Sequence, residues 1–191
     1  MSNQAAALNS VSLVNLALFK ITLYIPMTSC GHIGNSNNPL QLPWKVEHLP
    51  RLGTHFKSVV RGKHVVMGKK IASLYASHDL LKGCKRKFVL AREKCNDCDS
   101  SDWEYVPQQD ILNLSIHERV VCIGGVELLN SLYMTANELF FVVVNAELGG
   151  NIRMEPPNFK REGWIIQNEE HRRRYKQNRY PTSIFHCTRR L

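Results

Sequence analysis

The sequence predicts an α/β fold: a three-layer sandwich with a central, mostly parallel sheet, helices on both faces and an antiparallel C-terminal hairpin. Apolar runs of strand length alternate with helical patterns along the chain, which is the order that βαβ units produce. The run at 138–144, ELFFVVV, is dense in Phe and Val, as expected of a central strand buried on both faces. The last two apolar segments, 164–166 and 184–187, predict the paired strands of the hairpin.

The elements before the hairpin follow from local patterns. A first strand is expected at 21–25. Apolar residues recur at intervals of three and four over 49–60, which predicts an amphipathic helix, and a polar break with a glycine separates it from a strand at 64–67. The remaining expected elements are helices at 71–76, 111–115 and 126–133 and strands at 87–91 and 119–123.

Length and composition indicate one folded domain with an anionic partner. A chain of 191 residues with 43% hydrophobic residues can bury a core. Residues 20–191 are expected to form a single domain, and residues 1–19 an N-terminal extension without the basic start of a secretory signal. The net charge of +9 favours a phosphorylated cofactor, an acidic substrate, nucleic acid or a membrane surface, with a solvated basic face as the plain alternative.

Cysteine usage indicates a reducing compartment. The six cysteines lie in a chain too large to need disulfides, which favours the cytoplasm, with the mitochondrial matrix as the alternative. Cys95 and Cys98 have the spacing of half a zinc site, but no second pair exists, so no metal is predicted. No apolar run approaches the roughly 18 residues of a membrane span, so we expect no membrane partner. We also expect the protein to be a monomer.

Two glycine motifs predict a phosphate site. Met67-Gly68-Lys69-Lys70 closes one predicted strand, and Gly124-Gly125 separates another strand from a helix. Glycine lets the backbone approach a ligand closely, while helix amides and lysines attract phosphate. Gly124-Gly125 alone is weak evidence for such a site, but the two motifs together predict a pyrophosphate site.

Taken in order, Leu42-Pro43-Trp44, Phe56, Met67-Gly68-Lys69-Lys70 and Gly124-Gly125 resemble the dihydrofolate reductase family over about residues 20 to 190. The resemblance implies NADPH as cofactor, dihydrofolate or another pterin as substrate, and a place in one-carbon metabolism. By position it implies a cofactor site made of Ile33, Gly34, Gly68, Lys69, Lys70, Arg92, Gly124, Gly125, Val126 and Glu127. It implies a substrate site made of Ile25, Phe56, Lys85, Arg86, Ile123 and Val142, with Trp44 positioning a water.

The sequence departs from the family pattern where the proton is handled. The family's acid lies four residues before the aromatic, and this position is Leu52. Val142 stands where the family has a threonine, and Pro26 stands where a backbone N–H meets the nicotinamide. Glu47 is the only candidate for a substitute acid, although Leu49-Pro50 argues that the helix begins after it.

Two functions remain open at this point. One is an NADPH-dependent reductase of the dihydrofolate reductase class whose activity is weak because the acid is replaced. The other is a catalytically inactive member of the same fold that serves as a binding or structural subunit. The basic segment 171–179 would then contact nucleic acid or a protein, unless it is simply a charged hairpin.

Overall fold

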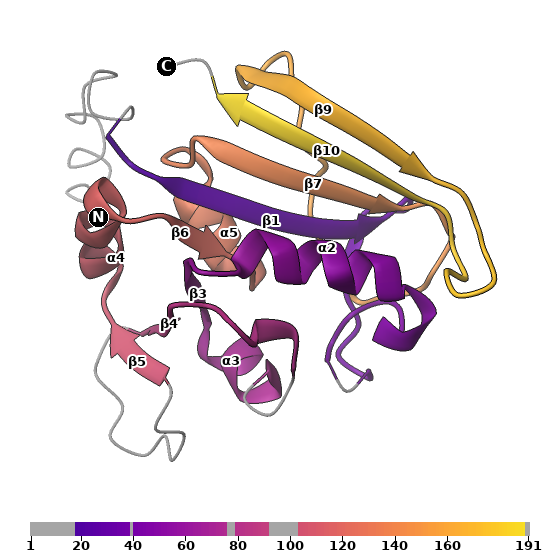
Figure 1. Cartoon of the computed structure of the whole chain (residues 1–191), viewed down its shortest axis with the longest axis horizontal. Helices are drawn as coiled ribbons and strands as arrows, with labels where there is room; N and C mark the ends of the chain where they lie inside the picture. The colour runs from indigo at the N-terminus through magenta and orange to yellow at the C-terminus, as the bar shows by residue number, and fades with distance from the viewer. Residues whose placement is uncertain (1–17, 39, 76–78, 92–102, 190–191) are drawn as a thin grey trace, which may run out of the picture.

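The computed structural model describes residues 18–38, 40–75, 79–91 and 103–189, and it shows a sheet of eight strands (Figure 1). The strands are β1 (Ile21–Thr28), β3 (His64–Gly68), β4 (Arg86–Leu90), β5 (Trp103–Val106), β6 (Val120–Cys122), β7 (Glu138–Val144), β9 (Trp164–Arg172) and β10 (Thr182–Arg189). Their order is β5-β4-β3-β6-β1-β7-β10-β9. Neighbours from β5 to β7 are parallel, whereas β10 runs antiparallel to both β7 and β9. The predicted mostly parallel sheet with an antiparallel C-terminal pair is confirmed.

Helices cover both faces of this sheet. The helices are α2 (Pro50–Val60), α3 (Lys69–Tyr75), α4 (Gln108–His117) and α5 (Val126–Tyr133), with short 3-10 turns η1 (Val46–His48) and η2 (Asp79–Leu81). The buried side chains of α2 and α3 belong to one core cluster, and those of α4 and α5 belong to a second cluster. Figure 1 shows α2 in front of the strands and α5 behind them. The two clusters on opposite faces make the three-layer sandwich that the sequence predicts.

Strand β1 lies at the centre of the sheet and alternates between the two cores. Its residues Leu23 and Ile25 pack in the α5 cluster, while Tyr24 between them packs in the α2 cluster. Strand β6 ends at Cys122, which pairs with Leu23 of β1. Strand β7 continues alongside β1 as far as Thr28. Pro26 therefore lies past the end of β6, where a missing N–H breaks no pairing with that strand.

Most predicted elements are present, and some are longer or were not expected. The helix α5 and strand β7 have the predicted bounds, whereas the first strand extends through Pro26 and α4 begins three residues early. Strand β5 was not predicted. Neither was the small sheet of β2 (His32–Gly34) and β8 (Ile152–Arg153). These pieces have two to four residues and owe their strand geometry to a neighbour, which local patterns do not reveal.

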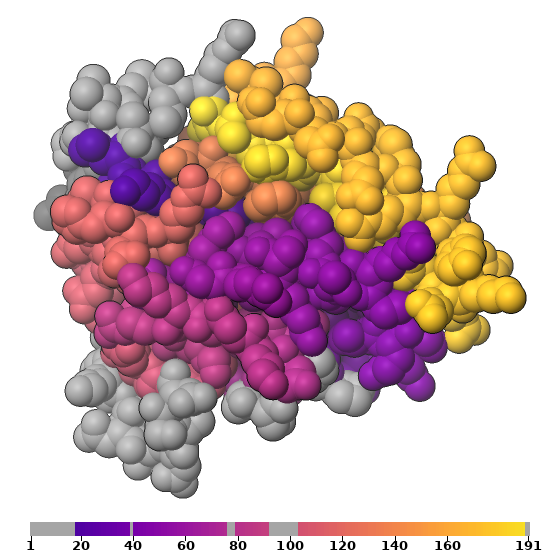
Figure 2. Space-filling view, viewed as in Figure 1, coloured from indigo at the N-terminus to yellow at the C-terminus, as the bar shows by residue number. Residues whose placement is uncertain are grey.

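The basic segment forms the end of the β9–β10 hairpin. Figure 2 shows this turn projecting at the right edge of the molecule, next to the N-terminal end of α2. The guanidinium of Arg51 lies 5.3 Å from the ring centre of Tyr175, and the backbone N–H of Arg179 donates to the carbonyl of His48. The segment is thus held against α2 while its charged ends face solvent. Over the described residues, no helix has the length and apolarity needed to cross a membrane.

Candidate functional site

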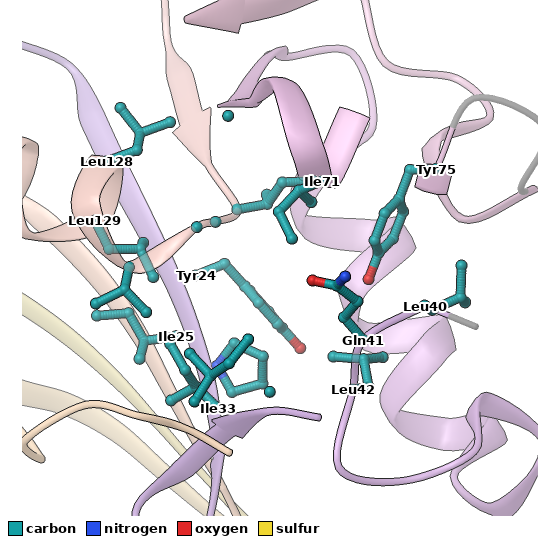
Figure 3. Close-up of a pocket in the computed structure, with 18 of the residues that line it drawn as sticks. Tyr24, Ile25, Ile33, Leu40, Gln41, Leu42, Ile71, Tyr75, Leu128 and Leu129 are labelled. Atoms are coloured by element: carbon teal, nitrogen blue, oxygen red, sulfur yellow. The ribbon is translucent and has the colours of Figure 1, made fainter. Parts of the chain in front are cut away.

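A cavity of about 690 Å³ lies where the C-terminal ends of β1, β3 and β6 meet the sides of α2, α3 and α5. Such a volume is within the usual range for small-molecule sites, and the ends of parallel strands are a common place for them. The cavity has a glycine-rich and basic part, formed by β3, α3 and the β6–α5 connection. It also has an apolar part, formed by β1, α2 and the loop before α2 (Figure 3).

The tips of β3 and β6 are joined directly in the first part. The N–H of Gly68 donates to the carbonyl of Gly124 at 3.0 Å, and the N–H of Ile123 donates to that of Val66 at 3.2 Å. Gly124 has a φ of 141°, a conformation that residues with a side chain rarely adopt. The helix α5 begins at once with Val126, and no side chain caps its first turn. Its first amides and its dipole are therefore available to an anion.

Two lysines stand beside these amides. Lys69 and Lys70 begin α3, are exposed, and line the cavity together with Val126 and Glu127. Backbone amides together with two cations form a donor set that suits the phosphates of a dinucleotide. The chemistry of these residues therefore fits the predicted cofactor.

A glycine closes the opposite side of this part. Gly34 lines the cavity with Ile33, and a Cβ on Gly34 would come within 2.8 Å of Ile152 Cδ1. A larger residue at position 34 would require the Ile152 side chain and the Gln41 carbonyl to shift. Nine of the ten predicted cofactor residues thus line one cavity, and the tenth, Arg92, lies outside the described residues.

The apolar part gathers most of the predicted substrate and catalytic positions. Ile25, Trp44, Phe56 and Ile123 all line the cavity, and so does Leu52, which is 6% exposed. Leu52 and Phe56 lie one helical turn apart on the buried face of α2. The position of the family's acid is therefore part of the cavity wall and carries an apolar side chain.

Glu47 does not reach the cavity. It lies in η1, is exposed, and lines a separate surface hollow with His48 and Arg174. The structure begins α2 at Pro50, which leaves Glu47 on a turn that faces away from the cavity. Its carboxylate is therefore not placed to act in the cavity. This corrects the expectation that Glu47 could substitute for the missing acid.

Three predicted substrate residues also lie elsewhere. Lys85 pairs with Glu118 at 2.7 Å and Arg86 pairs with Glu104, at the opposite end of β4 from the cavity. Val142 is fully buried in the α2 core cluster and does not line the cavity. The structure therefore removes Lys85, Arg86 and Val142 from the wall of the site.

Three polar side chains whose place in the site the sequence did not predict point into the apolar part. Figure 3 shows the hydroxyl groups of Tyr24 and Tyr75 and the amide of Gln41 directed into the cavity. Burial raises the pKa of Tyr24 above its ordinary value and raises that of Tyr75 to about 12, so both stay protonated at neutral pH. The alternation of β1 could have revealed that Tyr24 faces α2 rather than α5.

Tyr24 has a histidine partner on α2. Its hydroxyl lies 3.3 Å from Nδ1 of His55. Burial, followed by the positive charge of Arg172, lowers the pKa of His55 to about 4. Glu170 opposes this shift, and His186 adds to it. The imidazole is therefore neutral at physiological pH. The described residues include no cluster of three or more His, Cys, Asp or Glu side chains that could hold a metal.

Comparisons with known proteins agree with this geometry. The family model described as dihydrofolate reductase matches residues 20–189. A dihydrofolate reductase of Haemophilus influenzae is 27% identical over 169 residues, which cover 88% of this chain and 98% of that protein. A dihydrofolate reductase type 3 of Salmonella typhimurium is 29% identical over 146 residues, 75% of this chain and 82% of that protein.

A solved structure shows the same fold. A dihydrofolate reductase from Enterococcus faecalis, complexed with NADP(H) and RAB-propyl, superposes with a TM-score of 0.75 at 17% identity. The match covers 91% of this chain and 99% of that one. With the sheet order, the glycine motifs at the strand tips and the family match over residues 20–189, the chain belongs to the dihydrofolate reductase family.

Proposed function

We propose that the protein is an NADPH-dependent reductase that acts on dihydrofolate or a closely related pterin. The observation that carries this proposal is a single cavity that joins the basic glycine-rich part to an apolar part lined by Leu52, Phe56 and Trp44. The relatives named as dihydrofolate reductases, and the Enterococcus structure with its NADP(H), support the same assignment. We also propose that residues 20–191 act as one monomeric domain.

The residues of the basic part would hold the dinucleotide. Lys69 and Lys70 would neutralise phosphate charge, and the amides at the start of α5 would donate to the pyrophosphate. NADPH, when bound, supplies a hydride. The glycines at 68, 124 and 125 keep side chains out of the approach between the two strand tips.

The residues of the apolar part would hold the second substrate. Phe56, on the buried face of α2, offers a flat apolar contact to a ring. Ile25 of β1 lines the same cavity, although its side chain packs in the α5 cluster. The buried Trp44 lines the same part and brings an indole N–H that can hold a water molecule. This arrangement orients a ring and excludes bulk water from it.

The apolar side chain of Leu52 leaves the position of the family's acid without a proton donor. Reduction of dihydrofolate needs a hydride and a proton, and Leu52 cannot give the proton. General acid catalysis is typically worth 10²–10⁴-fold, so its absence raises the barrier by about 3–5 kcal/mol. We therefore propose slow turnover, with the proton taken from a water held near Trp44.

The test uses the full-length chain and separates binding from turnover. NADPH binding is followed by the change in nucleotide fluorescence, and turnover by the loss of NADPH absorbance with dihydrofolate between about pH 5 and pH 8. Saturable NADPH binding with slow, dihydrofolate-dependent oxidation is expected. Failure to oxidise NADPH at any pH in this range would exclude the reductase function.

A second candidate is a non-catalytic binding subunit with the same fold. Leu52 and Val142 are both apolar where the family pattern has a polar pair, and Tyr175 is 59% exposed among the charges of the hairpin. An exposed aromatic among arginines can stack a nucleic acid base. Salt-dependent binding of a single-stranded oligonucleotide that weakens in Tyr175→Ala, without any NADPH turnover, would favour this candidate.

A further inference from the structure

Among the described residues, those that line the apolar part of the cavity include polar side chains but no charged one. Tyr24, Gln41 and Tyr75 point into it (Figure 3), and the described residues that line it around Leu52 and Phe56 include no carboxylate. The carboxylate that lines the cavity, Glu127, belongs to the first turn of α5 in the basic part. A ligand ring in the apolar part would therefore meet hydrogen-bonding groups that are all neutral.

Packing fixes the position of the Tyr24 hydroxyl. The ring lies edge-on to Phe56 at 5.0 Å between ring centres and 6.4 Å from Phe140, and the residue is 3% exposed. These contacts come from α2 and β7, on both sides of β1. The hydroxyl therefore points to one place in the cavity and loses little conformational entropy when a ligand binds.

His55, which does not line the cavity, contacts the Tyr24 hydroxyl. The distance of 3.3 Å from the oxygen to Nδ1 is long for a bond of this kind, so the contact is weak. A hydroxyl has one donor and two acceptor sites, and a neutral imidazole can offer either N–H or a lone pair. With the proton on Nδ1, His55 donates to the oxygen and leaves the Tyr24 O–H free to donate into the cavity.

We propose that Tyr24, packed against Phe56 and in contact with His55, is the polar anchor of the substrate and selects an uncharged flat ring that presents a carbonyl oxygen to its hydroxyl. A ring that binds as a cation would lose hydration without meeting a carboxylate, which is costly in an apolar site. This inference rests on the proposed function, which gives the class of ring as a pterin. It gives this member of the family a specificity-determining residue on β1 in place of the acid on α2.

The test is a binding measurement on the full-length chain in the presence of NADPH. One probe is a pterin with its ring carbonyl. The other is the diaminopteridine in which an amino group replaces that oxygen and the ring takes up a proton more readily. Isothermal titration near neutral pH gives both dissociation constants. The variants are Tyr24→Phe, which keeps the packed ring, and His55→Phe, with Tyr180→Phe as a matched loss of a hydroxyl outside the cavity.

The native protein should bind the pterin at least about tenfold more tightly than the diaminopteridine. Tyr24→Phe should weaken pterin binding by about 3- to 10-fold, the usual value of one neutral hydrogen bond, and leave the diaminopteridine unaffected. His55→Phe should cause a smaller loss in the same direction, and Tyr180→Phe should change neither constant.

Three outcomes would overturn the proposal. They are tighter binding of the diaminopteridine by the native protein, equal loss of both probes in Tyr24→Phe, and no binding of either probe. If Tyr24→Phe does not fold, as judged by circular dichroism, an unchanged preference between the two probes in His55→Phe would also overturn the proposal. Dihydrofolate-dependent NADPH oxidation in the native protein distinguishes failure of the Tyr24 anchor from failure of the proposed reductase function. If oxidation occurs while the probes behave in these ways, the reductase function stands and only the anchor fails.

Discussion

Replacing Leu52 with aspartate should increase the rate of dihydrofolate reduction by about 10²- to 10⁴-fold. Leu52 lies in the wall of the cavity, one turn before Phe56, so a carboxyl group there would face a ring held against that aromatic. Partial burial raises the pKa of a carboxyl group, which lets it carry a proton closer to neutral pH. The variant would place a carboxyl group in the apolar part, where the described lining residues have none.

The magnitude follows from two opposing effects at the same position. Restored general acid catalysis lowers the barrier by about 3–5 kcal/mol. Leu52 is 6% exposed and packs in the α2 core cluster, so its loss should reduce the free energy of unfolding by about 2–4 kcal/mol. Because the site borders a cavity, water can reach the new carboxyl group, which keeps the cost within that range.

The assay compares Leu52→Asp with Leu52→Asn, which has the same shape but no proton to give. Initial rates of NADPH loss, NADPH affinity by fluorescence and urea unfolding are measured on both variants. The aspartate variant alone should gain rate, while both should lose similar stability. If both variants fold and bind NADPH, and their rates agree within about threefold, the missing-acid reasoning is refuted.

Three further predictions concern residues around the cavity and in η1. Lys69→Ala combined with Lys70→Ala should weaken NADPH binding by about 10- to 100-fold, measured by fluorescence; an equal loss in Lys57→Ala, on the exposed face of α2, would contradict a local role. Glu47→Gln should leave the NADPH oxidation rate within about twofold, because Glu47 faces a different hollow, and a loss above about tenfold would restore it as the acid. The lowered pKa of His55, about 4, means that the unfolded chain takes up its proton first as the pH falls, so this group's contribution to stability is lost between about pH 6.5 and pH 4. Allowing for solvent screening, the loss is about 1–2 kcal/mol, seen as a fall in Tm that His55→Gln should reduce; an unchanged pH profile in that variant would contradict it.

The sequence by itself determined the elements whose patterns are local. The helix Val126–Tyr133 and the strand Glu138–Val144 have the bounds that periodicity and apolar density predict. The order of the glycine and tryptophan motifs also indicated the family, and the count of four residues back from Phe56 located Leu52. These features depend on spacing along the chain, which the amino-acid order records directly.

Only the tertiary structure decided which side chains share the cavity. It turned Glu47 outward on η1, buried Val142 in the core and paired Arg86 with Glu104. It also brought Tyr24 of β1 next to His55 of α2, 31 residues away. The direction of a side chain depends on the packing of elements that are distant in sequence, and no local pattern contains that information.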